Sequence, residues 1–169
     1  DGANVTWDIT STPILISATG IFGTSIGTPY MSEYPTADRC VTTNIPGFGS
    51  KYSYWRTSPD GLDVVAEDIG SGLEIEYGEP LKLLQFPGNY QESFSDGYWL
   101  IGSALETATW TYVGYGTLVT TGGTFTDVVK MYGSHNDRTI FWNTSPIHPI
   151  LELDADNDGT MWVPVTDIG

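Results

Sequence analysis

Leu73-Glu74-Ile75-Glu76-Tyr77 alternates apolar and acidic side chains without interruption. In an extended strand, residues two apart lie on the same face, so this stretch places its apolar side chains on one face and its carboxylates on the other. The same alternation recurs in Trp110-Thr111-Tyr112-Val113 and in Leu151-Glu152-Leu153. The pattern predicts β-strands with one face in a core and the other in water.

Similar runs succeed one another along the chain, and residues typical of turns separate them, as in Ser58-Pro59-Asp60-Gly61 and Thr121-Gly122-Gly123. Apolar residues do not keep helical spacing over any window of about eleven residues. The best helical candidate, residues 102–109, is rich in threonine. We therefore expect an all-β fold: an antiparallel β-sandwich of the jelly-roll or Greek-key type, with a barrel as the alternative.

The composition restricts the partners. Six basic residues stand against 21 acidic ones, which gives the 169-residue chain a formal net charge of −15. Nucleic acids and anionic membrane surfaces are poor partners for such a chain, because both require clustered lysine and arginine. No apolar run approaches the roughly 20 residues that span a bilayer, so membrane insertion is not expected.

The length suits one domain, with a distinct segment at its start. Residues 10–28 carry no charge and contain Ile14-Leu15-Ile16 and Ile21-Phe22. We expect residues 1–28 to form an extended N-terminal arm or edge strand, and residues 29–169 to form a single β-sandwich domain. Two interpretations of the arm stay open. It pairs within its own domain, or it adds as a strand to a neighbouring copy and so mediates self-association.

Gly114-Tyr115-Gly116-Thr117-Leu118 followed by Gly123-Thr124-Phe125-Thr126-Asp127-Val128-Val129-Lys130 resembles a motif of β-rich secreted domains in Bacteroidetes-type bacteria. Ser58-Pro59-Asp60-Gly61-Leu62 and residues 81–87 are similar to upstream parts of such domains, and the likeness covers roughly residues 52–153. The resemblance implies an exported, extracellular or cell-surface β-sandwich-like domain. It implies no catalytic residue.

An acidic run near the end of the chain is the candidate metal site. Asp154, Asp156 and Asp158 alternate before Gly159, a spacing that can wrap oxygen ligands around Ca²⁺. An EF-hand is excluded, because Val165 stands where its bidentate glutamate belongs and a strand-like run comes after the acidic residues. The alternatives are a calcium loop completed by backbone carbonyls and Asp167, and a solvated hairpin turn.

Aromatic side chains make carbohydrate a second candidate ligand, because ring faces stack on the apolar faces of sugars. Most such rings in a β domain are core residues or cross-strand pairs. The candidates are Tyr52, Tyr54, Trp55, Tyr98, Trp99, Trp110, Tyr112 and Tyr115.

Catalysis is not expected. Glu74 and Glu76 lie about 7 Å apart on one strand face, a separation that suits paired glycosidase carboxylates, but alternating glutamates usually mark a wet face. Cys40, the only cysteine, is expected to be a buried small apolar residue. We expect His148 to be a satisfied strand residue, and no nucleophile motif accompanies His135.

The sequence thus predicts a non-catalytic extracellular domain with a structural or adhesive role, as a calcium-stabilised, self-assembling subunit of a surface or filamentous structure. The alternative is a carbohydrate-binding module.

Overall fold

The structure, a computed structural model, describes residues 2–12, 14–45, 47, 49–68, 74–134, 137–144, 147–153 and 159–163. These residues form twelve β-strands and no α-helix. The strands are β1 (Gly2–Asp8), β2 (Ile14–Thr24), β3 (Arg39–Ile45), β4 (Gly49–Ser58), β5 (Gly61–Asp68), β6 (Glu74–Gln85), β7 (Ser93–Leu100), β8 (Glu106–Thr120), β9 (Gly123–Gly133), β10 (Arg138–Thr144), β11 (Ile147–Leu153) and β12 (Gly159–Val163).

The predicted all-β class is confirmed. The hydrogen-bonded strand order is β1-β8-β7-β6-β5-β4-β3-β2-β12-β11-β10-β9, and β9 also pairs with β8. Most neighbours in this order are consecutive in the chain, and the order returns to β8, which is the connectivity of the barrel alternative. Of the strand pairs whose register the described residues define, β1 with β8 is parallel and the others are antiparallel.

Two strands run through positions where the sequence suggests an interruption. β6 continues through Gly78 and Pro80, and its pairing shifts register between Tyr77 and Glu79. β8 continues through the Gly-Tyr-Gly motif, with register shifts on either side of it. Glycine and proline mark β-bulges here and do not end the strands, because a bulge accommodates an unpaired residue within a continuous ladder.

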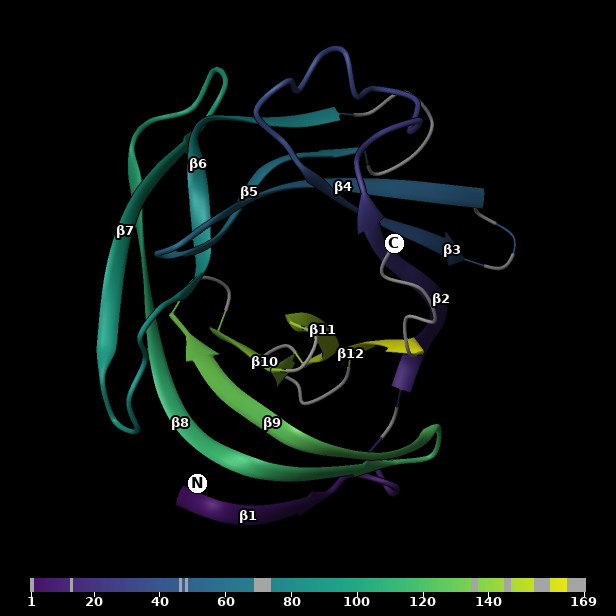
Figure 1. Cartoon of the computed structure of the whole chain (residues 1–169), viewed down its shortest axis with the longest axis vertical. Helices are drawn as coiled ribbons and strands as arrows, with labels where there is room; N and C mark the ends of the chain where they lie inside the picture. The colour runs from purple at the N-terminus through teal and green to yellow at the C-terminus, as the bar shows by residue number, and fades with distance from the viewer. Residues whose placement is uncertain are drawn as a thin grey trace. The chain divides into compact units, whose positions relative to one another are not determined.

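The chain divides into two compact units. The first unit contains residues 1–18, 88–94 and 109–163, and the second contains residues 19–87, 95–108 and 164–169. In the first unit, β1 lies beside β8, and β8 lies beside β9 (Figure 1). One buried cluster of this unit consists of Leu118, Val128, Phe141, Ile150, Leu151 and Leu153.

Contacts of aromatic rings and of Arg138 extend that cluster. The Trp7 ring of β1 meets the Phe141 ring of β10 edge to face, with 5.5 Å between the ring centroids. Arg138 donates a hydrogen bond to Glu152 over 3.1 Å, and its guanidinium lies 5.4 Å from the Trp110 ring centroid. These contacts connect β1, β8, β10 and β11.

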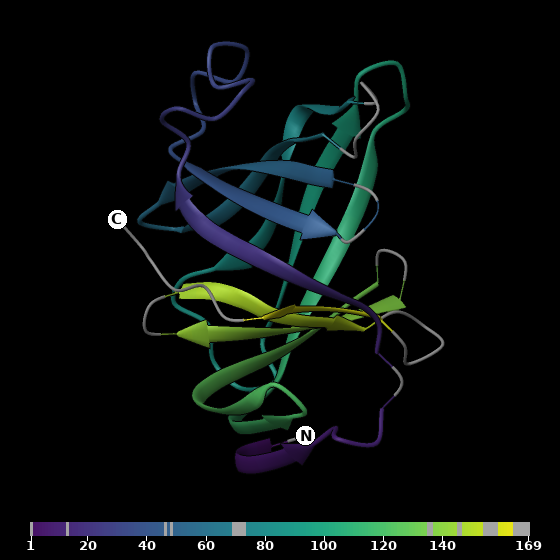
Figure 2. The ribbon, with the colours of Figure 1, turned by 90° about the vertical axis from the view of Figure 1, so that its right-hand side faces the viewer.

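In the second unit, β3 lies between β2 and β4 (Figure 2). One buried cluster of this unit consists of Tyr34, Ala37, Cys40, Tyr54, Val65 and Ala66. Cys40 is only 1% exposed, which confirms the prediction of a buried thiol. The Tyr54 hydroxyl accepts a hydrogen bond from the Tyr30 backbone N–H over 3.0 Å, so it anchors the segment between β2 and β3 on the β4 core.

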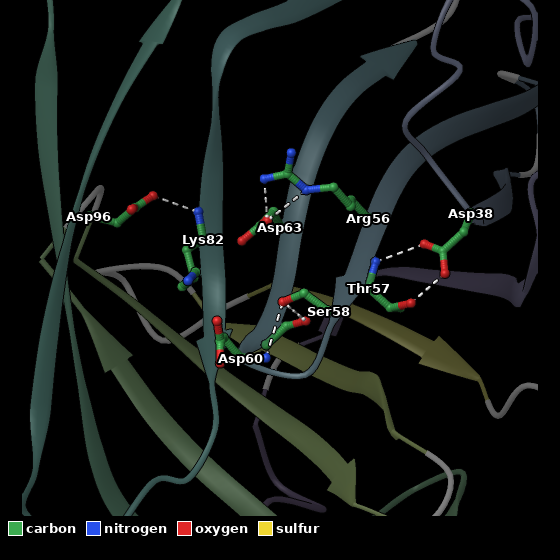
Figure 3. Close-up of polar contacts among 9 residues, drawn as sticks. Asp38, Arg56, Thr57, Ser58, Asp60, Asp63, Lys82 and Asp96 are labelled. Carbon is green, nitrogen blue, oxygen red and sulfur yellow. Dashed lines mark hydrogen bonds and ion pairs between the residues drawn. The ribbon is translucent and has the colours of Figure 1, made fainter.

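An ion pair between a buried carboxylate and a partly exposed arginine lies in the same unit (Figure 3). Asp63 of β5 is 4% exposed, and Arg56 of β4 donates to its Oδ2 through Nε at 3.0 Å and through Nη2 at 2.6 Å. Asp63 Oδ1 is buried and has no hydrogen-bond partner among the described residues. Among the described residues, the two N–H donors of the Arg56 guanidinium therefore offset the cost of burying the Asp63 carboxylate.

Nearby carboxylates bind backbone groups. The Asp38 carboxylate accepts hydrogen bonds from the backbone N–H and the hydroxyl of Thr57. Asp96 of β7 accepts the backbone N–H of Lys82 in β6 over 2.7 Å (Figure 3). These contacts join neighbouring segments of the second unit.

Both strands of the N-terminal segment pair within the chain. β1 runs along β8 from Gly2 opposite Gly114 to Asp8 opposite Val119, and β2 pairs with β3. β1 is the terminal strand of the hydrogen-bonded order. The domain boundary after residue 28 and the donation of this segment to another copy stay predictions.

Candidate functional site

The structure separates core rings from exposed rings among the aromatic residues predicted to bind carbohydrate. Five are buried, and Tyr52 is partly buried. Trp99 is 36% exposed and Tyr115 is 45% exposed. The buried five are Tyr54, Trp55, Tyr98, Trp110 and Tyr112. Trp99 is also the most exposed tryptophan whose side chain the structure describes.

Trp99 of β7 lies flat against its neighbouring strand. A Cβ atom added to Gly78 of β6 would meet the ring atoms Cη2, Cζ2 and Cζ3 at 2.1, 2.3 and 2.3 Å. Three nearly equal distances place that position over the face of the six-membered ring, because an approach to the ring edge would bring one atom much nearer than the other two. Gly78 therefore provides the space in which the indole lies on the sheet.

Residues of β6 and of the segment after β7 adjoin the strand positions of Trp99 and Gly78. Glu79 is the cross-strand partner of Trp99, and Glu76 alternates with Gly78 along β6. The backbone N–H of Ile101 donates to the Glu76 carbonyl over 3.0 Å, so the segment after β7 folds alongside β6. Ile101 is 59% exposed and Leu105 is 71% exposed. We call Trp99, Gly78, Glu76 and Glu79 the indole platform.

A second exposed aromatic group lies in the first unit. Tyr90, Tyr112 and Tyr115 line a hollow of about 270 Å³ together with the polar residues Asn89, Asp127 and Thr144. We call these six residues the tyrosine hollow. Tyr90 is 44% exposed, so its ring, like that of Tyr115, is accessible from solvent.

The glutamates considered for catalysis lie on the solvated face of β6. Glu74 and Glu76 are both exposed. Glu74 Oε2 accepts a hydrogen bond from the Tyr34 hydroxyl over 3.2 Å, and this contact contributes to raising the pKa of Tyr34, after the larger effect of burial. The arrangement is that of a strand face tied to a neighbouring loop.

The structure describes one of the two histidines and none of the predicted metal ligands. His148 is 5% exposed in β11. Among the described residues, no three histidine, cysteine, aspartate or glutamate side chains are grouped so that they could hold a metal ion. Asp154, Asp156, Asp158 and Asp167 lie outside the described residues, as does His135. The calcium site therefore stays a prediction.

Over the residues that the structure describes, no helix is long and apolar enough to cross a membrane. Comparison of the chain with protein-family models, curated proteins and solved structures finds no match. The two aromatic sites must therefore be interpreted from their own geometry.

Sequence reasoning identified Trp99 and Tyr115 but missed the residues that make them sites. Gly78 stands between the strand-like runs at residues 73–77 and 81–86, and nothing in the sequence pattern paired it with an indole twenty-one residues away. The sequence places Asn89 and Tyr90 about 25 residues before Tyr115, and it places Asp127 beyond the turn that follows β8. Only the fold brings these residues to one hollow. A glycine within a strand was the available signal, since such glycines often mark the close approach of another group.

Proposed function

We propose that this protein is a non-catalytic extracellular adhesive domain that binds carbohydrate through the indole platform. The single observation that carries the proposal is the Trp99 ring, which lies flat on Gly78 and stays 36% exposed. A flat, supported ring offers its free side to the apolar face of a pyranose, and its conformational entropy is already lost before binding. Of the two predicted functions, the carbohydrate-binding module thus gains specific support.

The charges around the platform narrow the class of glycan. Carboxylates accept hydrogen bonds from sugar hydroxyls, and Glu79 stands directly across from Trp99 on the neighbouring strand. The chain carries a net charge of −15, so uronic-acid and sulfated glycans would be repelled. We therefore expect neutral polysaccharides such as glucans, xylans or mannans to be the ligands.

The other parts of the predicted function stay proposals. Calcium at Asp154, Asp156, Asp158 and Asp167 would relieve part of the acidic charge and stiffen a loop. Self-assembly through the N-terminal segment would serve a surface or filamentous structure. Secretion to the cell surface is supported by the resemblance of the Gly-Tyr-Gly-Thr-Leu segment to exported domains.

Binding to a panel of immobilised neutral and acidic polysaccharides tests the proposal. We expect the native chain to be retained by at least one neutral polysaccharide, and retention to be lost in Trp99→Ala. Tyr132→Ala is the matched control, because Tyr132 is also an exposed ring, at 41%, but lies on β9 in the other unit. Equal loss in both variants, or no retention of the native chain on any glycan, would refute the proposal.

A second variant tests the geometry of the platform. Gly78→Ala keeps the indole but places a methyl group where the ring now lies, so the ring must lift or turn. We expect Gly78→Ala to weaken binding, while Gly97→Ala leaves it unchanged. The nearest atom to a Cβ on Gly97 is 3.7 Å away, which is an ordinary contact. Unchanged binding in Gly78→Ala would show that the flat seating of Trp99 is not what the glycan recognises.

A further inference from the structure

The tyrosine hollow has a chemistry different from that of the indole platform. It is concave, and three tyrosines from two segments line it, with Tyr90 on the segment before β7 and the other two on β8. Tyr112 is 7% exposed, while Tyr90 and Tyr115 are 44% and 45% exposed. The hollow thus has one buried ring and two accessible rings.

A bulge explains how Tyr112 and Tyr115 reach the same hollow. Residues three apart on a regular strand point to opposite faces. The register between β8 and β9 shifts between Tyr112 and Gly114, so one extra residue on β8 reverses the facing of the later residues of that strand. Both rings line the hollow for this reason.

The polar groups of the hollow include a carboxylate and two other groups whose hydrogen bonds the structure gives in part. Asn89 donates one side-chain N–H to Glu92 Oε2 over 2.9 Å, and its amide also carries an acceptor oxygen and a second N–H. Thr144 donates its hydroxyl to the Asp127 carbonyl over 2.7 Å. Asp127 adds a carboxylate and has a φ of 57°, a left-handed conformation that aspartate and asparagine tolerate. The described residues that line the hollow include no lysine, arginine or histidine.

Aromatic rings, a carboxylate and a lining without basic residues in its described part together favour a cation. A quaternary ammonium fits best, because its charge is spread over methyl groups that contact ring faces and it has no N–H that requires a directed acceptor. The net charge of −15 would raise the local concentration of such a cation. We propose that the tyrosine hollow binds a trimethylammonium group. This proposal does not rest on carbohydrate binding.

Calorimetric or NMR titration with choline tests the proposal, with 3,3-dimethyl-1-butanol as the neutral molecule of the same shape. We expect saturable choline binding and about tenfold weaker binding of the alcohol, because removing the charge removes the attraction to the rings and to Asp127. Phosphocholine is the second arm, and we expect it to bind more weakly than choline, since its phosphate would meet the Asp127 carboxylate and a described lining without basic residues. Tighter binding of phosphocholine than of choline would assign the hollow to phosphorylated headgroups and overturn the proposed selectivity.

Variants locate the site. Tyr115→Leu should abolish choline binding, Tyr115→Phe should retain it, and Asp127→Asn should weaken it while keeping a residue that tolerates the left-handed backbone. Trp99→Ala is the control outside the hollow and should bind choline normally. The proposal is overturned if choline does not bind saturably, if the neutral alcohol binds equally well, or if Tyr115→Leu binds like the native chain. Displacement of choline by methyl glucoside at lower concentration would make the hollow a sugar site and would also overturn it.

Discussion

Individual residues of the second unit are held in environments that change their chemistry. Burial raises the pKa of the Cys40 thiol from its ordinary value of 9.0 to about 11. The thiolate is the reactive form, so a thiol that stays protonated in the core is chemically inert. Cys40 therefore acts as a small apolar residue of the cluster around Tyr54 and Ala66.

The raised pKa has a consequence for stability that can be measured. Because the pKa of Cys40 is higher in the folded chain than in the unfolded one, its contribution is fully present below pH 9 and is lost as the pH rises towards about 11. We expect urea unfolding to show this loss of stability in the native chain and a smaller loss in Cys40→Ala.

We also expect a thiol reagent at neutral pH to label Cys40 only after unfolding. Rapid labelling of the folded chain would contradict the buried position.

The Arg56–Asp63 pair makes a second prediction at this scale. Arg56→Met leaves the buried Asp63 carboxylate without its two guanidinium donors. Because the Arg56 side chain is 41% exposed and solvent screens part of the interaction, we expect a loss of about 2 kcal/mol in the free energy of unfolding. Arg56→Met combined with Asp63→Leu should recover part of that loss in chemical denaturation. A double variant less stable than Arg56→Met alone would show that the carboxylate contributes in another way.

At the scale of elements, the parallel contact of β1 with β8 depends on glycines of β8, and most strictly on Gly116. A Cβ on Gly116 would lie 1.9 Å from the Val5 carbonyl oxygen and 2.6 Å from the Val5 nitrogen, which are both backbone atoms of β1. β1 has a register shift between Ala3 and Val5 at the same place, and Asn4 between them has a φ of 55°. The Gly-Tyr-Gly motif is thus explained at Gly116 by the close approach of β1.

Substitution at this position should release the first strand. We expect Gly116→Ala to lower the free energy of unfolding by about 1–3 kcal/mol, in the range typical of overpacking, and to increase hydrogen exchange at residues 2–8. Gly97→Ala, within β7, is the control and should change neither quantity. If exchange in β1 is unchanged in Gly116→Ala, β1 is not held against β8 by this contact. Light scattering of the same variant would show whether a released β1 joins another copy.

In β6 and β8, the sequence predicted the strand character but did not predict that each strand is continuous. Alternation in residues 73–77 predicted the strand character of β6, and the turns at residues 59–60 and 121–122 were predicted by their glycine and proline neighbours. The continuity of both strands was not predicted, because Gly78, Pro80 and Gly116 have the same local signature at a bulge as at a turn. The Trp99 ring over Gly78 and the β1 strand beside Gly116 show that these glycines lie at bulges within continuous strands. Both contacts are long-range, so the local sequence does not reveal them.

The candidate sites, like the strands, were predicted in part from local sequence and depend in part on long-range contacts. Trp99 and Tyr115 were among the predicted aromatic residues, but sequence alone did not separate them from the five rings that are buried. Exposure depends on which face of each strand meets the core, and bulges in β6 and β8 change that facing partway along the strand. The hollow around Tyr90 depends on such a change, so no local pattern could have located it.

At the scale of the whole molecule, the surplus of fifteen negative charges is the dominant physical property. Self-repulsion destabilises a compact acidic chain, and both salt screening and specific cation binding relieve it. We expect calcium to raise the melting temperature more than a monovalent salt of equal ionic strength does. Replacing Asp154, Asp156 and Asp158 together by asparagine should remove that difference. A melting temperature unchanged by EDTA in the calcium-loaded chain would contradict a calcium site.

Carbohydrate binding through the indole platform is tested most directly by the affinities of the native chain and of Trp99→Ala for the neutral polysaccharide that retains the native chain best. We expect at least about a tenfold loss of affinity in Trp99→Ala, equivalent to about 1.4 kcal/mol, while Tyr132→Ala binds like the native chain. Equal affinities of the native chain and Trp99→Ala would contradict this function, because the exposed indole on Gly78 is the observation on which carbohydrate binding rests.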